Sequence, residues 1–551
     1  MKKILLLCLT LLAIASIKAQ FISQVIYQRS YTKPQIDSIL TSQGVPAGIF
    51  TTTYGVRTYK LIYHTVAADS SPTTASGLLI VPQGAPCKIP ILSYQHNEIT
   101  RKSDAPSRYK QEWYVGLAAA SIGFISVLPD YLGLGDGQGL HPFLHLQSQA
   151  TATIDMIRAA KEIVDTTGAQ PNSQLFLGGY SEGGYATMAA HQYIQTYLGG
   201  QLHVTASAAI AGYYDMSGTM VQQIISDSIY TQPYYLPYLL FGYNSVYHYY
   251  TADSDMLVYP YDSTLHPLFN GTKSISTINA QMPNVPKHIM HQDQIDSIKN
   301  DSTNFLRVLL KKNDAYNWSP TSPLHLFFCN ADEQVPYQNT VAAYQHFVQN
   351  GSTMVDTINA GPSYTHYLCA EFSVLIAIQL FTGLRSQPIT STIHISNDTS
   401  ATNPCGSAIV LPSLGMPPYT VHWSNGDTTT TTSHLSAGTY YVTITDQSLC
   451  THTDSAIVHT VTANGINDYN LDHIRSYPNP TNGMVIIENN NTDEKLEQIE
   501  LLDINGKALN TYMVYEGNTT KLYFDEEAKG VYLLHVKAQS GKELHRKIVL
   551  L

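Results

Sequence analysis

Residues 179–183, Gly-Tyr-Ser-Glu-Gly, have the Gly-x-Ser-x-Gly form that sets a serine on a sharp turn. An apolar run precedes them, and small residues at 185–190 follow. These two segments predict a strand and a helix, so Ser181 would stand on the strand-to-helix turn that exposes a nucleophile. Glycine suits both flanks, because a side chain held at positive φ leaves no space for nearby Cβ atoms.

A serine hydroxyl is a weak nucleophile and needs a base that is oriented by an acid. Asp332 follows the apolar run 324–329, and His366 follows the run 353–359 through a Gly-Pro loop. Both positions are loops after predicted strands, in the order Ser, acid, His. We therefore expect Ser181 as nucleophile, His366 as base and Asp332 as orienting acid, with Glu333 as the alternative acid.

The negative oxygen that forms during attack on a carbonyl needs two backbone N–H donors. One donor is expected at Glu182, directly after the nucleophile. The second should come from the loop after the earlier strand, residues 93–97, so that the backbone of His96 or of Asn97 is the candidate.

The elements that position these residues follow an alternating pattern over residues 21–384, in which short β-branched or aromatic runs alternate with longer helical stretches. Strands are predicted at 89–94, 123–128, 174–179, 207–212, 324–329 and 353–359, and helices at 146–164, 182–197 and 366–381. Continuous apolar strands predict an α/β fold with a mostly parallel sheet buried on both faces. The Tyr-rich segment 213–322 interrupts the pattern and is interpreted as an inserted cap, with an irregular surface insertion as the alternative.

A resemblance to a known family rests on several blocks that follow one another in the family's order. They are residues 94–97 (YQHN), 129–135 (PDYLGLG), 141–143 (HPF), the Ser181 turn, Asp332 with the Val-Pro of 335–336, and His366. Over residues 50–384 the chain resembles the secretory lipases related to fungal lipase A. The resemblance implies an α/β-hydrolase domain at 20–385 that cleaves carboxylic esters without a cofactor, with Ser181, Asp332 and His366 as triad. Asn97 stands where relatives usually carry Gly, and Asn is the residue next best able to adopt positive φ.

Two small all-β sandwich modules are expected after this domain. Alternating strands and turn residues predict a β-sandwich at 390–462, which resembles the repeat of gliding-type bacterial adhesins, the SprB repeat. Four blocks within 468–551, at 477–483, 501–507, 530–536 and 547–550, resemble a type IX secretion C-terminal sorting domain of type A. That resemblance implies a Gram-negative bacterium, export across the outer membrane and the type IX secretion machinery as a partner.

The N-terminus predicts export as well. Two lysines, an apolar run at 4–17 and a small-residue end indicate a signal peptide at 1–19 that is cleaved after Ala19. The run is too short to span a membrane, and no transmembrane segment is expected elsewhere. A net charge of −11 without a basic stripe excludes a nucleic-acid binder. The protein is therefore expected to be secreted or displayed at the cell surface.

Cysteine and histidine spacing gives weaker expectations. Cys405 and Cys450 lie in one module and are the best disulfide candidates, while the pairing of Cys87, Cys329 and Cys369 stays open. Two histidine pairs, 141 with 145 and 288 with 291, have helical spacing that suits a metal, but each lacks a third ligand. No metal site and no cofactor are expected.

Three functions are compatible with these features of the sequence. The first is an esterase or lipase that acts on a small-molecule or lipid ester. The second is a serine peptidase, which uses the same triad but whose relatives carry a large N-terminal propeller. The third is a non-catalytic adhesin or binding protein, which predicts a broken triad, whereas all three members are present in order.

Overall fold

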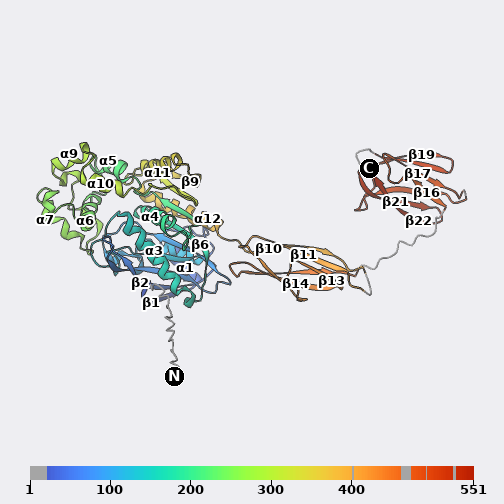
Figure 1. The fold of residues 1–551 in the computed structure, drawn as a ribbon, viewed down its shortest axis with the longest axis horizontal. Helices are drawn as coiled ribbons and strands as arrows, with labels where there is room; N and C mark the ends of the chain where they lie inside the picture. The colour runs from blue at the N-terminus through green and yellow to red at the C-terminus, as the bar shows by residue number, and fades with distance from the viewer. Residues whose placement is uncertain (1–20, 400–402, 461–472, 492, 525–528) are drawn as a thin grey trace, which may run out of the picture. The chain divides into compact units, whose positions relative to one another are not determined.

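The computed structural model describes residues 21–399, 403–460, 473–491, 493–524 and 529–551 (Figure 1). The expected signal peptide at 1–19 lies outside these residues. The chain divides into two compact units. The first comprises the residues up to 390 together with 412–420 and 444–452, and the second comprises the rest.

The first unit is built on a nine-stranded sheet in the order β1-β2-β3-β5-β4-β6-β7-β8-β9. Its strands are β1 (Ile22–Tyr31), β2 (Val56–Val66), β3 (Pro72–Pro82), β4 (Ile89–Gln95), β5 (Ile125–Pro129), β6 (Pro171–Tyr180), β7 (Ala206–Ile210), β8 (Leu324–Cys329) and β9 (Val355–Gly361). Strands β1, β2, β3 and β5 pair antiparallel. From β5 through β4 to β9 every pairing is parallel. The parallel half therefore gathers the carboxyl ends of β4, β6, β8 and β9 at one edge.

Helices pack on the sheet and complete three hydrophobic clusters with it. They are α1 (Lys33–Ser42), α2 (Trp113–Ser121), α3 (Leu146–Ile163), α4 (Glu182–Tyr197), α11 (Gln338–Gln349) and α12 (His366–Leu384), with the short turns η1 (Lys102–Asp104), η2 (Pro106–Arg108) and η3 (Val164–Thr167). Strands β4, β5 and β7 are buried at every position, as the continuous apolar runs predict. Among the described residues, α12 is the one helix long and apolar enough to span a membrane, and it contacts β6, β7, β8 and β9.

The segment between β7 and β8 is helical throughout its named elements, which Figure 1 shows gathered in green on one side of the first unit. It contains η4 (Met216–Met220), α5 (Val221–Ile224), α6 (Tyr235–Tyr247), η5 (Asp253–Asp255), α7 (Tyr261–Thr264), η6 (His266–Phe269), α8 (Ile275–Asn279), η7 (Pro286–Ile289), α9 (Gln292–Asn300) and α10 (Phe305–Lys312). Its buried aromatic and aliphatic side chains form one hydrophobic cluster with α4 and the strands β7 and β8. The segment is therefore a packed domain insertion, and we call it the cap.

The expected α/β fold is confirmed, and the six predicted strands match β4 to β9 within three residues at each end. The three strands β1 to β3 were not predicted. Strands β1 and β2 lack a continuous apolar run, since β1 is mostly exposed and β2 alternates buried residues with Arg57, Lys60 and His64. Antiparallel strands at a sheet edge tolerate such polar positions on their open face. Strand β3 does carry a buried apolar run, at 78–81, which was not recognised in the sequence.

The remaining described residues form small antiparallel sheets. One sheet has the order β10-β11-β13 and another β12-β14-β15. Their strands are β10 (Thr390–Ser396), β11 (Gly406–Ser413), β12 (Thr420–Trp423), β13 (Thr431–Leu435), β14 (Gly438–Thr445) and β15 (Thr451–Val458). The last two sheets have the orders β16-β17-β20-β19 and β18-β21-β22. Their strands are β16 (Ile474–Tyr477), β17 (Met484–Asn489), β18 (Leu496–Leu502), β19 (Thr511–Glu516), β20 (Thr519–Phe524), β21 (Gly530–Ala538) and β22 (Glu543–Leu550), and they share one apolar core.

The expected pairing of Cys405 with Cys450 is wrong. Cys450 is bonded to Cys87, Cys329 is bonded to Cys369, and Cys405 is exposed without a disulfide. The segment 444–452, which holds Cys450, belongs to the first unit, where Ser448 accepts a backbone hydrogen bond from Lys88. Proximity in sequence therefore gave the wrong disulfide partner for Cys450, because the loop that holds Cys450 contacts the segment before β4 rather than Cys405.

Candidate active site

Ser181 lies between β6 and α4 in the strained turn that the sequence predicts. Its φ of 58° and ψ of −118° are unusual for a residue with a Cβ atom. The two flanking glycines are required sterically. A Cβ atom on Gly183 would lie 1.9 Å from the carbonyl oxygen of Gln95, and one on Gly179 would lie 2.4 Å from that of Gly183. The turn is thus possible only with this glycine pattern.

His366 and Asp332 meet Ser181 at the carboxyl edge of the sheet. His366 is the first residue of α12, and its Nε2 lies 2.9 Å from Ser181 Oγ. The Nδ1 atom of the same ring lies 2.7 Å from Asp332 Oδ2. Asp332 Oδ1 accepts the backbone N–H groups of Gln334 at 3.0 Å and of Val335 at 2.8 Å, which fixes the carboxyl group. The structure therefore brings the three predicted residues into one hydrogen-bonded row.

Glu333, the alternative acid, is also in contact with His366, but through the backbone. Its Oε2 accepts the main-chain N–H of His366 at 3.0 Å. Burial lowers the pKa of the His366 ring, and the carboxyl groups of Asp332, Glu98 and Glu333 raise it, so that the net pKa lies above its ordinary value. Between the two acids, Asp332 is thus the one that touches the ring nitrogen.

A residue that the sequence did not single out, Glu98, lies at the nucleophile. Ser181 Oγ donates to its Oε2 at 2.8 Å, while the other carboxyl oxygen accepts the hydroxyl of Tyr235 from the cap. Ser181 is fully buried, and Glu98 is 6% exposed. The Ser181 hydroxyl carries one proton and faces two acceptors, Glu98 and His366.

The cap closes over the triad through tyrosine hydroxyls. Tyr230 donates to the carbonyl of Gln334 at 2.6 Å, and Tyr235 donates to its side chain at 3.1 Å. Tyr238 donates to the carbonyl of Ile99 at 2.9 Å. These contacts join the cap to the loop after β4 and to the loop after β8, so the structure has the closed arrangement in which the nucleophile is covered.

In the loop expected to supply the second N–H donor, the backbone N–H of Asn97 already donates to a carboxyl group. The backbone N–H of Asn97 donates to Glu112 Oε2 at 3.1 Å, and the hydroxyl of Tyr94 donates to the same oxygen at 3.2 Å. Burial raises the pKa of Glu112 to about 8. His96 is buried, and burial lowers the pKa of its ring to about 4, so the ring is neutral. In this structure the Asn97 N–H is thus occupied by Glu112.

The other expected donor, Glu182, is fixed at the start of α4 by its own side chain. Its buried carboxyl lies 2.6 Å from Nε2 of His141 and accepts the amide of Gln149 at 2.5 Å. His141 in turn contacts the carbonyl of Leu132 through Nδ1 at 2.7 Å. His141 therefore orients the nucleophile turn. Its sequence neighbour His145 caps α3, so this pair is not arranged around a metal.

An open cavity of about 340 Å³ begins at the loop after β4, on the side of α2 and α12. Its lining is mixed and combines aromatic rings with aliphatic, carboxyl and amide groups; the aromatic residues are Tyr94, Tyr114, Tyr180, Tyr367 and Phe372. The hydroxyl of Tyr180 donates to the carbonyl of His366 at 2.9 Å. The cavity therefore reaches residues that contact the triad.

The sequence did not predict the contacts of Glu98 and Tyr235 or the disulfide between Cys329 and Cys369. Glu98 follows directly after the predicted donor loop, and this position is the sequence feature that could have indicated its place at the site. Tyr235 lies 137 residues from Glu98 along the chain, and no local pattern connects them. The disulfide links the end of β8, three residues before Asp332, to the first turn of α12, three residues after His366.

Comparisons with known proteins identify two regions of the chain. Residues 110–373 match the family described as secretory lipase, and residues 475–550 match the secretion system C-terminal sorting domain. No curated protein matches the chain in sequence.

Two solved structures resemble the first unit. A protein from Legionella pneumophila described as a hydrolase is 26% identical, with a TM-score of 0.62 over 66% of this chain and 98% of the other. A ligand-bound form of the rice cell wall degrading esterase from Xanthomonas oryzae is 25% identical, with a TM-score of 0.60 over 66% of this chain and 97% of the other.

These matches confirm an esterase or lipase type of hydrolase and a protein that is secreted or displayed at the cell surface. They do not include the repeat expected at 390–462, which stays a prediction. The chain therefore carries a secretory lipase region at residues 110–373 and a type IX secretion sorting domain at residues 475–550.

Proposed function

We propose that this protein is a secreted serine hydrolase of carboxylic esters that works through an acyl-enzyme. The observation that carries the proposal is the row of contacts from Ser181 Oγ through the His366 ring to Asp332, at 2.9 and 2.7 Å. Nucleophile, base and orienting acid within hydrogen-bond distance are the requirement for activating a serine hydroxyl.

In the first step Ser181 Oγ attacks the ester carbonyl while His366 Nε2 takes the hydroxyl proton. Asp332 holds the ring so that Nδ1 keeps its proton and Nε2 presents its lone pair. His366 then gives the proton to the leaving alcohol, and the acyl group stays on Ser181. A water molecule, activated by the same ring, cleaves the acyl-enzyme and restores the serine.

The tetrahedral intermediate needs donors for its negative oxygen. The backbone N–H of Glu182, at the start of α4, is the first proposed donor. The second is proposed from the backbone of residues 96–97, as expected from the sequence. In the closed structure the backbone N–H of Asn97 donates to the carboxyl group of Glu112. If Asn97 is that donor, this hydrogen bond must break during the reaction so that the N–H can donate to the substrate oxygen.

The surroundings of the site favour a lipophilic or aromatic ester. The cap segment that covers Ser181 contributes many buried tyrosine, phenylalanine and leucine side chains, and the neighbouring cavity is lined by aromatic rings. A similar protein is described as a rice cell wall degrading esterase, which supports adding plant cell wall esters to the substrates tested.

The test is hydrolysis of p-nitrophenyl esters of increasing acyl chain length by the purified full chain, with tributyrin and acetylated xylan in parallel. Ser181→Ala should lower kcat by about 10⁴-fold or more. Ser173→Ala is the matched control, because Ser173 is exposed on the same strand β6, and it should keep full activity. Equal ester hydrolysis by Ser181→Ala and by the wild type would overturn the mechanism.

The same assay separates the alternative functions. A peptidase would release p-nitroaniline from peptide anilides faster than p-nitrophenol from esters. A non-catalytic binding protein would hydrolyse neither substrate above the rate of Ser181→Ala. The proposal predicts ester hydrolysis alone.

A further inference from the structure

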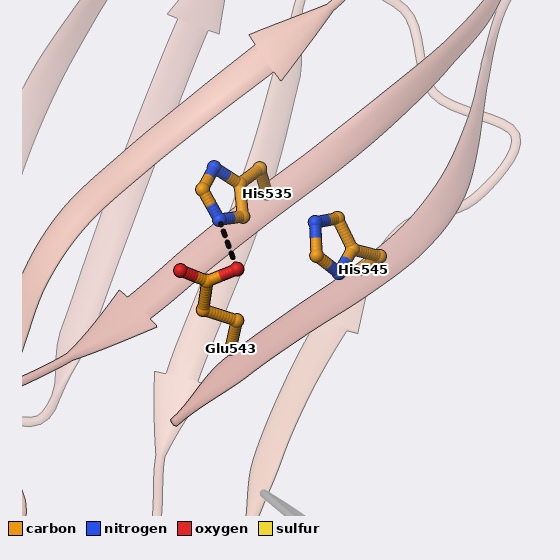
Figure 2. A group of neighbouring side chains, drawn as sticks. All are labelled: His535, Glu543 and His545. Atoms are coloured by element: carbon orange, nitrogen blue, oxygen red, sulfur yellow. Dashed lines mark ion pairs between the residues drawn. The ribbon is translucent and has the colours of Figure 1, made fainter. Parts of the chain in front are cut away.

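Three side chains that are common ligands of transition metals gather on the β-hairpin of β21 and β22. His535 on β21 pairs directly across the ladder with His545 on β22, and Glu543 precedes His545 by two residues. Side chains alternate between the faces of a strand, so all three project from the same face. Figure 2 shows them side by side above the two strands.

The opposite face of the hairpin is anchored in the core of its sheet. Leu534, Val536, Leu544 and Ile548 are buried there and belong to one hydrophobic cluster. The strand backbones that carry the three side chains are therefore held in register. A ligand set on such a support needs only side-chain rotations to close on an ion.

The donor atoms are already near the spacing that a metal requires. One atom from each of His535, Glu543 and His545 lies within 4.8 Å of the others. The Nε2 atom of His535 is 3.5 Å from Glu543 Oε2, and the two imidazole rings are stacked with centroids 4.6 Å apart. Bonds of about 2.1 Å in a tetrahedral zinc site separate ligand atoms by about 3.4 Å, so the donor atoms must move closer together and the stacked rings must rotate toward one ion.

Two of the nitrogens are also buried without a hydrogen bond. Within the described part of the chain, Nε2 of His535 and Nδ1 of His545 are buried and accept or donate no hydrogen bond. A buried polar atom without a partner costs free energy, and such atoms call for an explanation. A metal ion would bind both lone pairs once the two stacked rings rotate so that their in-plane nitrogens converge.

Glu500 supports the same arrangement from the other side of His535. It pairs with His535 from the neighbouring strand β18, and its Oε2 lies 3.8 Å from Nδ1 of that ring. Histidines that bind metals commonly direct their second nitrogen to a carboxylate, which fixes the tautomer. Glu500 is therefore placed to accept a hydrogen bond from Nδ1 when the ring turns to bind an ion through Nε2.

We propose that His535, Glu543 and His545 bind a divalent transition-metal ion, with Zn²⁺ as the preferred ion and water at the fourth position. Two imidazoles and one carboxylate suit zinc, whereas Ca²⁺ and Mg²⁺ prefer sites made only of oxygen ligands. Lys537 lies 4.0 Å from the second oxygen of Glu543 and balances this carboxyl group when no ion is bound. The site belongs to the sorting-domain region and has no part in ester hydrolysis.

The test uses the full chain without an affinity tag, stripped of metal by a chelator and titrated with Zn²⁺ in a calorimeter. The double variant His535→Gln with His545→Gln should bind one Zn²⁺ fewer per chain than the wild type. The matched control, His394→Gln with His422→Gln, changes two exposed histidines on β10 and β12 and should bind as the wild type does. Co²⁺, titrated separately, should give the visible absorption of a four-coordinate site in the wild type and not in the double variant.

Two further variants keep the test decisive if the double variant fails to fold. Glu543→Gln changes a side chain that is 42% exposed and should weaken Zn²⁺ binding without changing the apo fold. Glu500→Gln should weaken it by about 10–100-fold at unchanged stoichiometry, because Glu500 acts through His535. The proposal is overturned if the wild type binds no Zn²⁺, or if these variants bind it with wild-type stoichiometry and affinity.

Discussion

Oγ of Ser181 lies 2.8 Å from Oε2 of Glu98, a buried carboxyl group that the cap holds through Tyr235. The one serine proton therefore has two possible acceptors, Glu98 and His366, whose Nε2 lies 2.9 Å away. Glu98 acts on the base as well, because its charge is one of those that raise the pKa of His366. The proposed nucleophile is thus hydrogen-bonded to a carboxyl group outside the proposed triad.

Glu98→Gln should move the acid limb of the kcat/KM profile to lower pH by about half to one pH unit. His366 must be neutral to act as the base, so activity is lost as pH falls through the pKa of its ring. The variant removes one of the charges that raise this pKa, and the acid limb therefore moves to lower pH. The measurement is the pH dependence of ester hydrolysis. Glu371→Gln, an exposed change on α12, is the control that should leave the limb in place. An unchanged or higher limb in Glu98→Gln would contradict this role.

Asp332→Asn should lower kcat by about 10³–10⁴-fold, because the amide favours the wrong tautomer of His366. Glu333→Gln should cost far less, since Glu333 contacts the backbone N–H of His366 and not the ring. Steady-state kinetics of the two variants decides between the acids. A larger loss in Glu333→Gln would assign the acid to Glu333 instead.

Removing the disulfide between Cys329 and Cys369 should lower the free energy of unfolding of the catalytic unit by about 2–5 kcal/mol. The bond closes a loop over a sequence separation of 40 and ties the strand before Asp332 to the helix that begins with His366. Urea unfolding of Cys329→Ala with Cys369→Ala measures the effect, with Cys405→Ala as a control that breaks no disulfide. Equal stability of the two proteins would show that the bond is not a stabilising element.

Glu112→Gln should gain stability relative to the wild type as pH rises from 4.5 to about 8, with no further gain above. Burial raises the pKa of Glu112, so in this window the folded state holds a proton that the unfolded state has lost. The contribution of Glu112 is complete below the unfolded pKa and is lost as pH rises through the folded one. Denaturant unfolding across the window tests this, and a difference that is independent of pH would refute it.

The sequence was sufficient to predict that Ser181, Asp332 and His366 come together, because each of them carries a local signal. Ser181 stands in a glycine pattern between an apolar strand and a helix, and Asp332 and His366 each follow an apolar run. The carboxyl ends of parallel strands meet at one edge of a sheet, so the loops after β6, β8 and β9 had to come together.

The contacts that the sequence did not predict join segments distant along the chain. Glu98 and Tyr235 are 137 residues apart, and Cys87 and Cys450 are 363 apart. His535 and His545 lie on two strands, and they come together only through the register of the β21–β22 hairpin. Each of these depends on tertiary packing or strand register, which periodicity and motif spacing do not encode.

The most direct test of the account is covalent labelling of the nucleophile by the phosphate ester paraoxon. Intact-mass measurement should find one phosphoryl group per chain, and peptide mapping should locate it on Ser181. Ester hydrolysis should be lost in proportion to labelling. Ser181→Ala should take up none. Labelling of another residue, or full hydrolysis by a chain already labelled at Ser181, would contradict the proposal that Ser181 forms the acyl-enzyme.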